Sequence, residues 1–248
     1  MKKILLIAGC SHTAGSEIDG TNDSEYNRQH SFGNVLATKM GYEPINIASP
    51  SSTNHTIARS VIDWFADQYD ATTMEVFVLV AWTESTRMEI PDSNICWYER
   101  HAPHADWYAV SSRHFKRLNQ GYEGGNAEEK EMMPYYHRFM ATHDTYLEIQ
   151  SANAVLQLQY FFNMHKVKYV MCNTMHMFNA KSSHVNLYLT HIDSTKYMDM
   201  TDTDAAFFWK YRNAGYINPK AQYWHHDEIP HDMYSDVLHD FIERNKCL

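Results

Sequence analysis

The sequence predicts a three-layer α/β/α sandwich built around a mostly parallel sheet. Short apolar runs, typical of buried strands, alternate with longer segments whose apolar residues recur every three or four positions. The strongest run, at residues 74–82, is continuously apolar, as expected for a central strand covered on both faces. A length of 248 residues suits one such domain with an insertion, and 44% apolar residues suffice for its core. We therefore expect a single domain over residues 1–248.

The apolar runs and the polar segments between them place the elements in order. Strands are expected at residues 3–10, 43–48, 74–82 and 167–172. Helices are expected at residues 31–40, 54–69, 142–164, 205–211 and 230–245. The helix at 54–69 illustrates the reasoning, since Ile57, Val61 and Trp64 fall on one of its faces. Asp19-Gly20 and neighbouring polar residues favour turns, so residues 16–32 are expected to form a loop up to the first helix.

The segment from about residue 92 to 140 loses all clear periodicity. It is rich in aromatic residues and histidines, including Trp97, Trp107 and Tyr122. Structureless segments of this length are uncommon inside a domain unless they are functional or contain an unrecognised element. We expect an aromatic-rich insertion with short helices.

Composition excludes several classes of protein. The formal net charge of −9 argues against a sequence-independent nucleic-acid binder, which needs a basic face. No apolar run approaches the ~20 residues of a membrane span. The apolar stretch at residues 4–8 is shorter than the roughly 7–15 residues of a signal-peptide core. Four scattered cysteines, with no C-x-x-C pair, indicate reduced thiols and a cytoplasmic protein.

The sixteen histidines do not form a recognisable metal site. His101 with His104, and His225 with His226, lack the i,i+4 spacing typical of zinc enzymes, and no H-E-x-x-H occurs. The turn at residues 9–15 matches neither G-x-G-x-x-G nor a P-loop, which disfavours a flavodoxin-like nucleotide binder. We expect no metal and no cofactor.

The most informative segment is Gly9-Cys10-Ser11-His12-Thr13-Ala14-Gly15, which follows the first apolar run. A buried strand that stops at a small polar turn places a serine hydroxyl at the carboxyl edge of the sheet, where open α/β sheets bind ligands. Three further polar stretches follow predicted strands or precede the last helix. They lie at residues 46–54, 81–87 and 224–231.

These four stretches, in this order, resemble the blocks of the SGNH/GDSL hydrolase family. The first block is similar to a divergent branch, common in phage genomes, that reads Gly-Cys-Ser-x-Thr. The resemblance implies a flavodoxin-like, SGNH-like sandwich with Ser11 as nucleophile and the N–H of Ser11 as one oxyanion donor. Ser51 stands where the family has a glycine whose N–H is a second donor. Thr83 stands where the family has an asparagine side chain as the third.

The resemblance leaves the general base open between registers of the last block. Aligning His225-His226-Asp227-Glu228 with the family pattern makes His225 the base, which we prefer, although no aspartate lies two or three residues before it. Aligning Pro230 with the family proline leaves Ile229 at the histidine position. Taking His231 as the base leaves Asp227 four residues upstream. A Ser–His dyad without a carboxylate remains compatible with activity.

The resemblance implies a serine esterase or deacetylase that acts through an acyl-enzyme on a small ester, such as an O-acetyl group on a carbohydrate. The insertion would supply aromatic surfaces for the sugar. The alternative is a non-catalytic SGNH-fold binding or virion-associated protein, because three of the four blocks depart from the family pattern at functional positions. Neither nucleic acid nor membrane is expected as a partner, and a phage-encoded chain would lie in the host cytoplasm or the virion. Whether the chain is an enzyme, and its oligomeric state, are left open.

Overall fold

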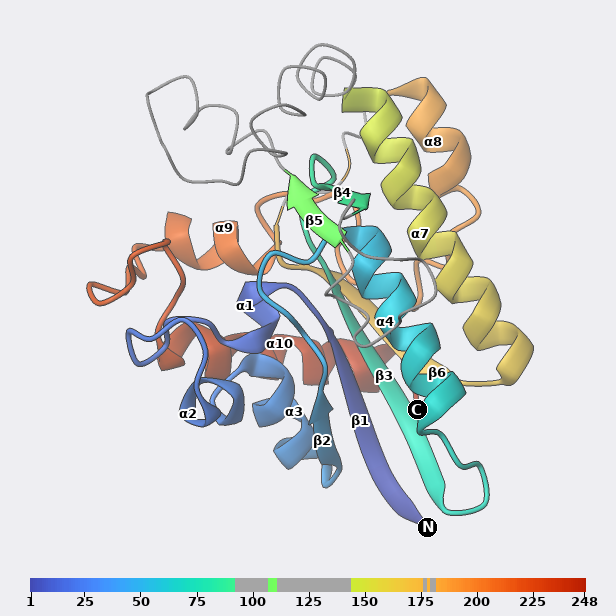
Figure 1. The fold of residues 1–248 in the computed structure, drawn as a ribbon, viewed down its shortest axis with the longest axis horizontal. Helices are drawn as coiled ribbons and strands as arrows, with labels where there is room; N and C mark the ends of the chain where they lie inside the picture. Colours follow the sequence, from blue (N-terminus) through green and yellow to red (C-terminus); the bar gives the residue numbers. More distant parts are fainter. Residues whose placement is uncertain (92–106, 111–143, 176–177, 179–181) are drawn as a thin grey trace.

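The computed structural model describes residues 1–91, 107–110, 144–175, 178 and 182–248. Its main sheet has four parallel strands in the order β2-β1-β3-β6 (Figure 1). The strands are β1 (Lys2–Gly9), β2 (Glu43–Asn46), β3 (Met74–Trp82) and β6 (Lys168–Asn173). Helices cover both faces, which confirms the predicted three-layer α/β sandwich.

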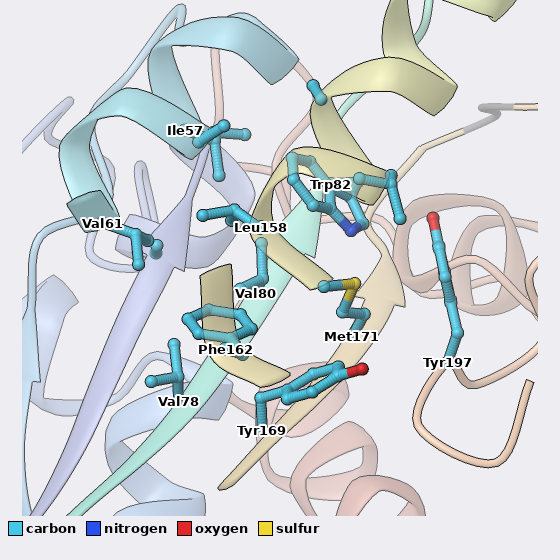
Figure 2. Close-up of a cluster of buried hydrophobic side chains, with 14 of the residues drawn as sticks. Ile57, Val61, Val78, Val80, Trp82, Leu158, Phe162, Tyr169, Met171 and Tyr197 are labelled. Atoms are coloured by element: carbon cyan, nitrogen blue, oxygen red, sulfur yellow. The ribbon is translucent and has the colours of Figure 1, made fainter. Parts of the chain in front are cut away.

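One face of the sheet packs against α4 (Asn54–Asp67) and α7 (Asp144–His165) (Figure 1). Side chains along a strand alternate between faces, so every second residue of β3 belongs to this core. Figure 2 shows Val78 and Val80 of β3 packed with Val61 of α4 and with Leu158 and Phe162 of α7. Helix α8 (Ser183–Leu189) packs beside α7.

The other face packs against α3 (Phe32–Met40) and α10 (Glu228–Asn245). Here Phe77 and Leu79, the intervening residues of β3, share a core with Leu36 of α3 and Leu238 of α10. Because both faces are buried, β3 has no polar position between Val76 and Trp82. The same double burial explains why the sequence predicts this strand at its observed bounds.

Three shorter helices lie near the carboxyl ends of the strands: α1 (Ser11–Ala14), α2 (Glu25–Gln29) and α9 (Phe207–Asn213) (Figure 1). The prediction of a loop over residues 16–32 is therefore wrong at α2, which Ser24 caps by accepting a hydrogen bond from Asn27 N–H. Arg28 anchors α2 to the end of β2 by donating to the Asn46 carbonyl.

Within the predicted insertion, β5 (Trp107–Val110) forms an antiparallel pair with β4 (Met88–Pro91), which lies just before the insertion. The sequence prediction of short helices there missed this pair. The rest of the insertion, at residues 92–106 and 111–143, lies outside the described residues. The helix α8 was also not predicted, because seven residues give too short a periodic pattern.

The strand order reverses direction at the carboxyl ends of β1 and β3. The chain leaves β1 toward β2 with α3 on one face, and then reaches β3, on the other side of β1, through α4 on the opposite face. In open α/β sheets such a reversal leaves a crevice outside the strand ends, and ligands bind there. Gly9 of β1 lies opposite Ala81 of β3, so the segments that follow both strands meet at this point.

Candidate active site

The turn that carries Ser11 requires glycine at position 9. A Cβ on Gly9 would lie 2.1 Å from Thr13 Oγ1 and 2.8 Å from the Ala81 carbonyl oxygen. Its absence lets α1 fold directly onto the end of β1, where Thr13 N–H and Ala14 N–H both donate to the Cys10 carbonyl. Ser11 is thereby fixed as the first residue of α1, and its side chain is almost completely buried.

The Ser11 hydroxyl meets an imidazole from the other end of the chain. Ser11 Oγ lies 2.8 Å from His225 Nε2, although 214 residues separate them. His225 precedes α10, and Asp227 caps that helix by accepting a hydrogen bond from Ile229 N–H. Of the histidines considered for the base, the structure brings His225 to Ser11.

The other ring nitrogen of His225 contacts a carboxylate that the sequence did not single out. His225 Nδ1 lies 2.6 Å from Glu17 Oε2. The same carboxylate accepts hydrogen bonds from the backbone N–H groups of Gln222 and Tyr223. Burial alone would raise the pKa of Glu17, but the hydrogen bonds from His225, Tyr223 and Gln222 outweigh it and hold the pKa below its ordinary value. Ser11, His225 and Glu17 thus form a continuous hydrogen-bonded chain.

Glu17 escaped the sequence analysis for a physical reason. The family pattern places the carboxylate just before the histidine, whereas Glu17 lies 208 residues away from His225 and six residues after Ser11. Its segment is polar and rich in turn formers, which is typical of an exposed loop, yet Glu17 is only 2% exposed. The one indication in the sequence was the absence of an aspartate just before His225, which left the second nitrogen of that imidazole without an assigned partner.

The alternative base, His231, lies in the core between α3 and α10. Its Nδ1 accepts a hydrogen bond from Phe32 N–H at 3.1 Å, and its ring is 4.7 Å from that of Phe207. Burial holds the pKa of His231 well below the ordinary value, so the ring is neutral. Asp227, its proposed partner, is the cap of α10. The structure therefore places the His231 and Asp227 pair in structural positions.

Thr83 follows β3 and is completely buried. Its backbone is held by Asn54, whose Oδ1 accepts from Thr83 N–H at 3.0 Å and whose Nδ2 donates to Ser151 Oγ at 3.0 Å. The Thr83 hydroxyl, by contrast, has no hydrogen-bond partner among the described residues. Buried hydroxyls are normally hydrogen-bonded, so an unpartnered hydroxyl at this position is unusual.

Ser51 adopts the backbone conformation that glycine would favour. Its φ is +66°, in the left-handed region, and its side chain is exposed. The loop around it is held by Arg87, which donates to the Ser52 carbonyl and pairs with Glu84 at 3.2 Å. The Arg87 and Glu84 side chains are only 13% and 14% exposed, so this ion pair is largely buried.

His12, the residue after Ser11, is buried beside His225. Its ring centroid is 4.6 Å from that of His225 and 5.3 Å from that of Phe208. Burial, followed by the nearby His225, lowers the pKa of His12 well below its ordinary value. A neutral ring at this position adds no positive charge next to His225.

The described residues contain no group of three or more His, Cys, Asp or Glu side chains arranged to hold a metal ion. Cys10, Cys172 and Cys247 are buried free thiols, and Cys96 lies outside the described residues. Among the helices that the structure describes, none is both long and apolar enough to cross a bilayer.

Comparison with known families matches residues 16–247 to a family of unknown function, DUF6071. The chain belongs to this family. The matched DUF6071 region includes Glu17 and His225 and begins after Ser11. No curated protein matches the chain.

Several solved structures resemble this DUF6071 protein in shape at low identity. A psychrotrophic esterase from Pseudoalteromonas sp. is 9% identical with a TM-score of 0.46, over 97% of both chains. A member of the lipolytic G-D-S-L family from Veillonella parvula is 9% identical with a TM-score of 0.44, over 98% of this chain and 100% of the other. An acetyl xylan esterase from Butyrivibrio proteoclasticus is 12% identical with a TM-score of 0.46, over 99% of this chain and 64% of the other.

Proposed function

We propose that this DUF6071 protein is an SGNH-like serine esterase that works through an acyl-enzyme. The contact between Ser11 Oγ and His225 Nε2, at 2.8 Å, carries this proposal. A nucleophile within hydrogen-bond reach of a base is the arrangement that activates a serine hydroxyl. In this proposal His225 Nε2 takes the hydroxyl proton while Ser11 Oγ bonds to the ester carbonyl carbon.

The rest of the reaction follows from the same two groups. The tetrahedral intermediate collapses, the bond from the carbonyl carbon to the leaving oxygen breaks, and the His225 imidazolium gives its proton to that oxygen. A water molecule then attacks the acyl-enzyme, His225 takes its proton, and the bond to Ser11 Oγ breaks as that proton returns to Oγ. The products are a carboxylic acid, an alcohol and the free enzyme.

Three donors are proposed for the oxyanion. The N–H of Ser11 is at the start of α1, where helix N–H groups lack intrahelical partners. The N–H of Ser51 and the hydroxyl of Thr83 complete the set. The unpartnered state of the Thr83 hydroxyl among the described residues supports its inclusion. A preorganised donor of this kind typically contributes about 10²–10³ in rate.

The proposed substrate is a small ester, with O-acetyl groups on carbohydrate as the preferred class. Ser11 and His225 are 8% and 7% exposed, which favours a short acyl group over a long chain. The sequence resemblance that suggests a phage-type branch, and with it a location in the host cytoplasm or virion, remains part of this proposal. The buried thiols fit a reducing compartment.

Hydrolysis of p-nitrophenyl acetate tests the proposal. The wild-type protein is expected to exceed the rate of Ser11→Ala and of His225→Ala by at least about 10³-fold, because each variant removes one half of the reacting pair. Both variants should keep the wild-type circular dichroism spectrum. Equal rates for wild type and Ser11→Ala, both near background, would reject the esterase and favour a non-catalytic binding protein.

A further inference from the structure

We propose that Glu17 is the positioning carboxylate of the site, the third member of a Ser11–His225–Glu17 group, supplied from the segment that follows the nucleophile. This inference rests on the proposed function. In the family pattern an aspartate two or three residues before the histidine has this positioning role. This chain has Tyr223 and Gln222 at those positions, and we assign the role to Glu17. Glu17 fixes which nitrogen of His225 carries the proton, and it stabilises the imidazolium that forms during catalysis.

The hydrogen-bond pattern determines the tautomer of His225. An ionised carboxylate can only accept hydrogen bonds, and Glu17 already accepts from Gln222 N–H and Tyr223 N–H. The 2.6 Å contact with His225 Nδ1 therefore requires a proton on Nδ1. In the neutral ring Nε2 is then unprotonated and can accept from Ser11 Oγ, which is the state a general base needs.

Two strained residues hold this arrangement in place. Glu17 has φ of +65° and Trp224 has φ of +70°, both in the left-handed region that non-glycine residues rarely adopt. The turn at Trp224 allows both Tyr223 N–H and the His225 ring to face the Glu17 carboxylate. The backbone of Glu17 is held separately, because Asn218 Nδ2 donates a hydrogen bond to its carbonyl oxygen at 2.7 Å. Strain of this kind persists where surrounding contacts impose it, commonly at functional sites.

The placement of Glu17 couples it to the nucleophile. Ser16 N–H donates to the Ser11 carbonyl, so the turn that ends α1 leads directly into Glu17. Gly15, with φ of +78°, closes this turn, and a Cβ there would lie 2.3 Å from the Asn27 carbonyl oxygen. The nucleophile and the carboxylate therefore belong to one rigid segment, and the imidazole is inserted between them from the C-terminal part of the chain.

Kinetics of Glu17→Gln and Glu17→Asp test the assignment on p-nitrophenyl acetate. In Glu17→Gln the amide can donate to Nδ1 and so favour the wrong tautomer, and we expect kcat to fall about 10³–10⁴-fold with little change in KM. The acidic limb of the kcat/KM profile should move to lower pH, because the neighbouring charge that favours protonated His225 is gone. Glu17→Asp should recover at least about tenfold of the loss.

Asn218→Ala is the matched control, because it removes the hydrogen bond from Asn218 Nδ2 to the Glu17 backbone carbonyl and leaves the Glu17 carboxylate intact. It should lower Tm while leaving the pH profile unmoved. If Glu17→Gln keeps wild-type kcat and an unmoved acidic limb, Glu17 is structural only and the inference is overturned.

A second measurement separates failure of this inference from failure of the proposed function. Nitrogen-15 spectra of the wild-type protein should show His225 protonated at Nδ1, and those of Glu17→Gln should show protonation shifted to Nε2. If the wild-type protein shows this tautomer pattern but is inactive, the proposed esterase function is rejected, whereas the role of Glu17 in positioning the His225 ring is retained. An Nε2-protonated ring in the wild type would overturn the positioning role whatever the activity.

Discussion

Removal of the Thr83 hydroxyl is expected to affect the stability of the fold and the rate of the reaction in opposite directions. The hydroxyl is buried with no hydrogen-bond partner among the described residues, so it lowers the stability of the unliganded fold. We expect Thr83→Val to leave the free energy of unfolding unchanged or to raise it, and to lower kcat about 10²-fold through loss of an oxyanion donor. Urea denaturation and steady-state kinetics measure the two effects.

The control for Thr83→Val is Tyr169→Phe. Tyr169 also carries a buried hydroxyl without a partner among the described residues, but it packs beside Phe162 in the apolar core between β6 and α7 (Figure 2). Its removal should affect stability in the same direction and leave kcat unchanged. A Thr83→Val enzyme with wild-type kcat would remove Thr83 from the proposed oxyanion site.

Ser51 gives a second prediction at the residue scale. Its φ of +66° suits glycine, so Ser51→Gly should stabilise the fold by about 0.5–1 kcal/mol. The proposed donor is the backbone N–H, which the substitution keeps, so kcat/KM should stay within about twofold. A large loss of activity in both Ser51→Gly and Ser51→Ala would show that the hydroxyl, not the N–H, contributes.

At the scale of the element, the junction of β1 and α1 determines where Ser11 lies. Gly9→Ala would place a methyl group against Thr13 Oγ1 and the Ala81 carbonyl oxygen. We expect a loss of about 1–3 kcal/mol in stability and at least about a tenfold loss in kcat, because α1 must move away from the strand. Gly41→Ala, where a Cβ meets nothing within 4 Å, should cost stability through its φ of +71° but leave kcat unchanged. Equal kcat losses in both variants would argue against a local role for Gly9.

The elements differ in how far sequence alone could predict them. β3 is buried on both faces, so its apolar run marks its ends. The helices α2 and α8 were missed because five and seven residues carry little periodicity. In the site, the order of polar blocks predicted Ser11 and His225 as partners, whereas Glu17 depends on a tertiary contact that no local pattern encodes.

At the scale of the whole molecule, buried histidines make stability depend on pH. Burial is the main cause that lowers the pKa of His12, His226 and His231 below 6.5 in the folded protein. Below pH 6.5 the unfolded chain therefore binds more protons than the folded one, and the stability present above that pH is lost as pH falls. Each histidine contributes a slope of up to about 1.4 kcal/mol per pH unit. Glu17, whose pKa is lowered from 4.5, adds a further loss below that pH.

Urea denaturation at about pH 7.5, 6.5, 5.5 and 4.5 measures this dependence, because these pH values span the ordinary histidine pKa of about 6.5. We expect the free energy of unfolding to fall steadily below pH 6.5. A constant free energy of unfolding down to pH 5 would contradict the neutral state assigned to the buried histidines.

The most direct test of the central claim is covalent labelling with a fluorophosphonate, followed by mass spectrometry of the proteolytic peptides. The account predicts one phosphonylated residue, Ser11, in the wild-type protein, slower labelling in Glu17→Gln, and none in His225→Ala. An unlabelled wild type, or a label on any other residue at the same rate in Ser11→Ala, would contradict it.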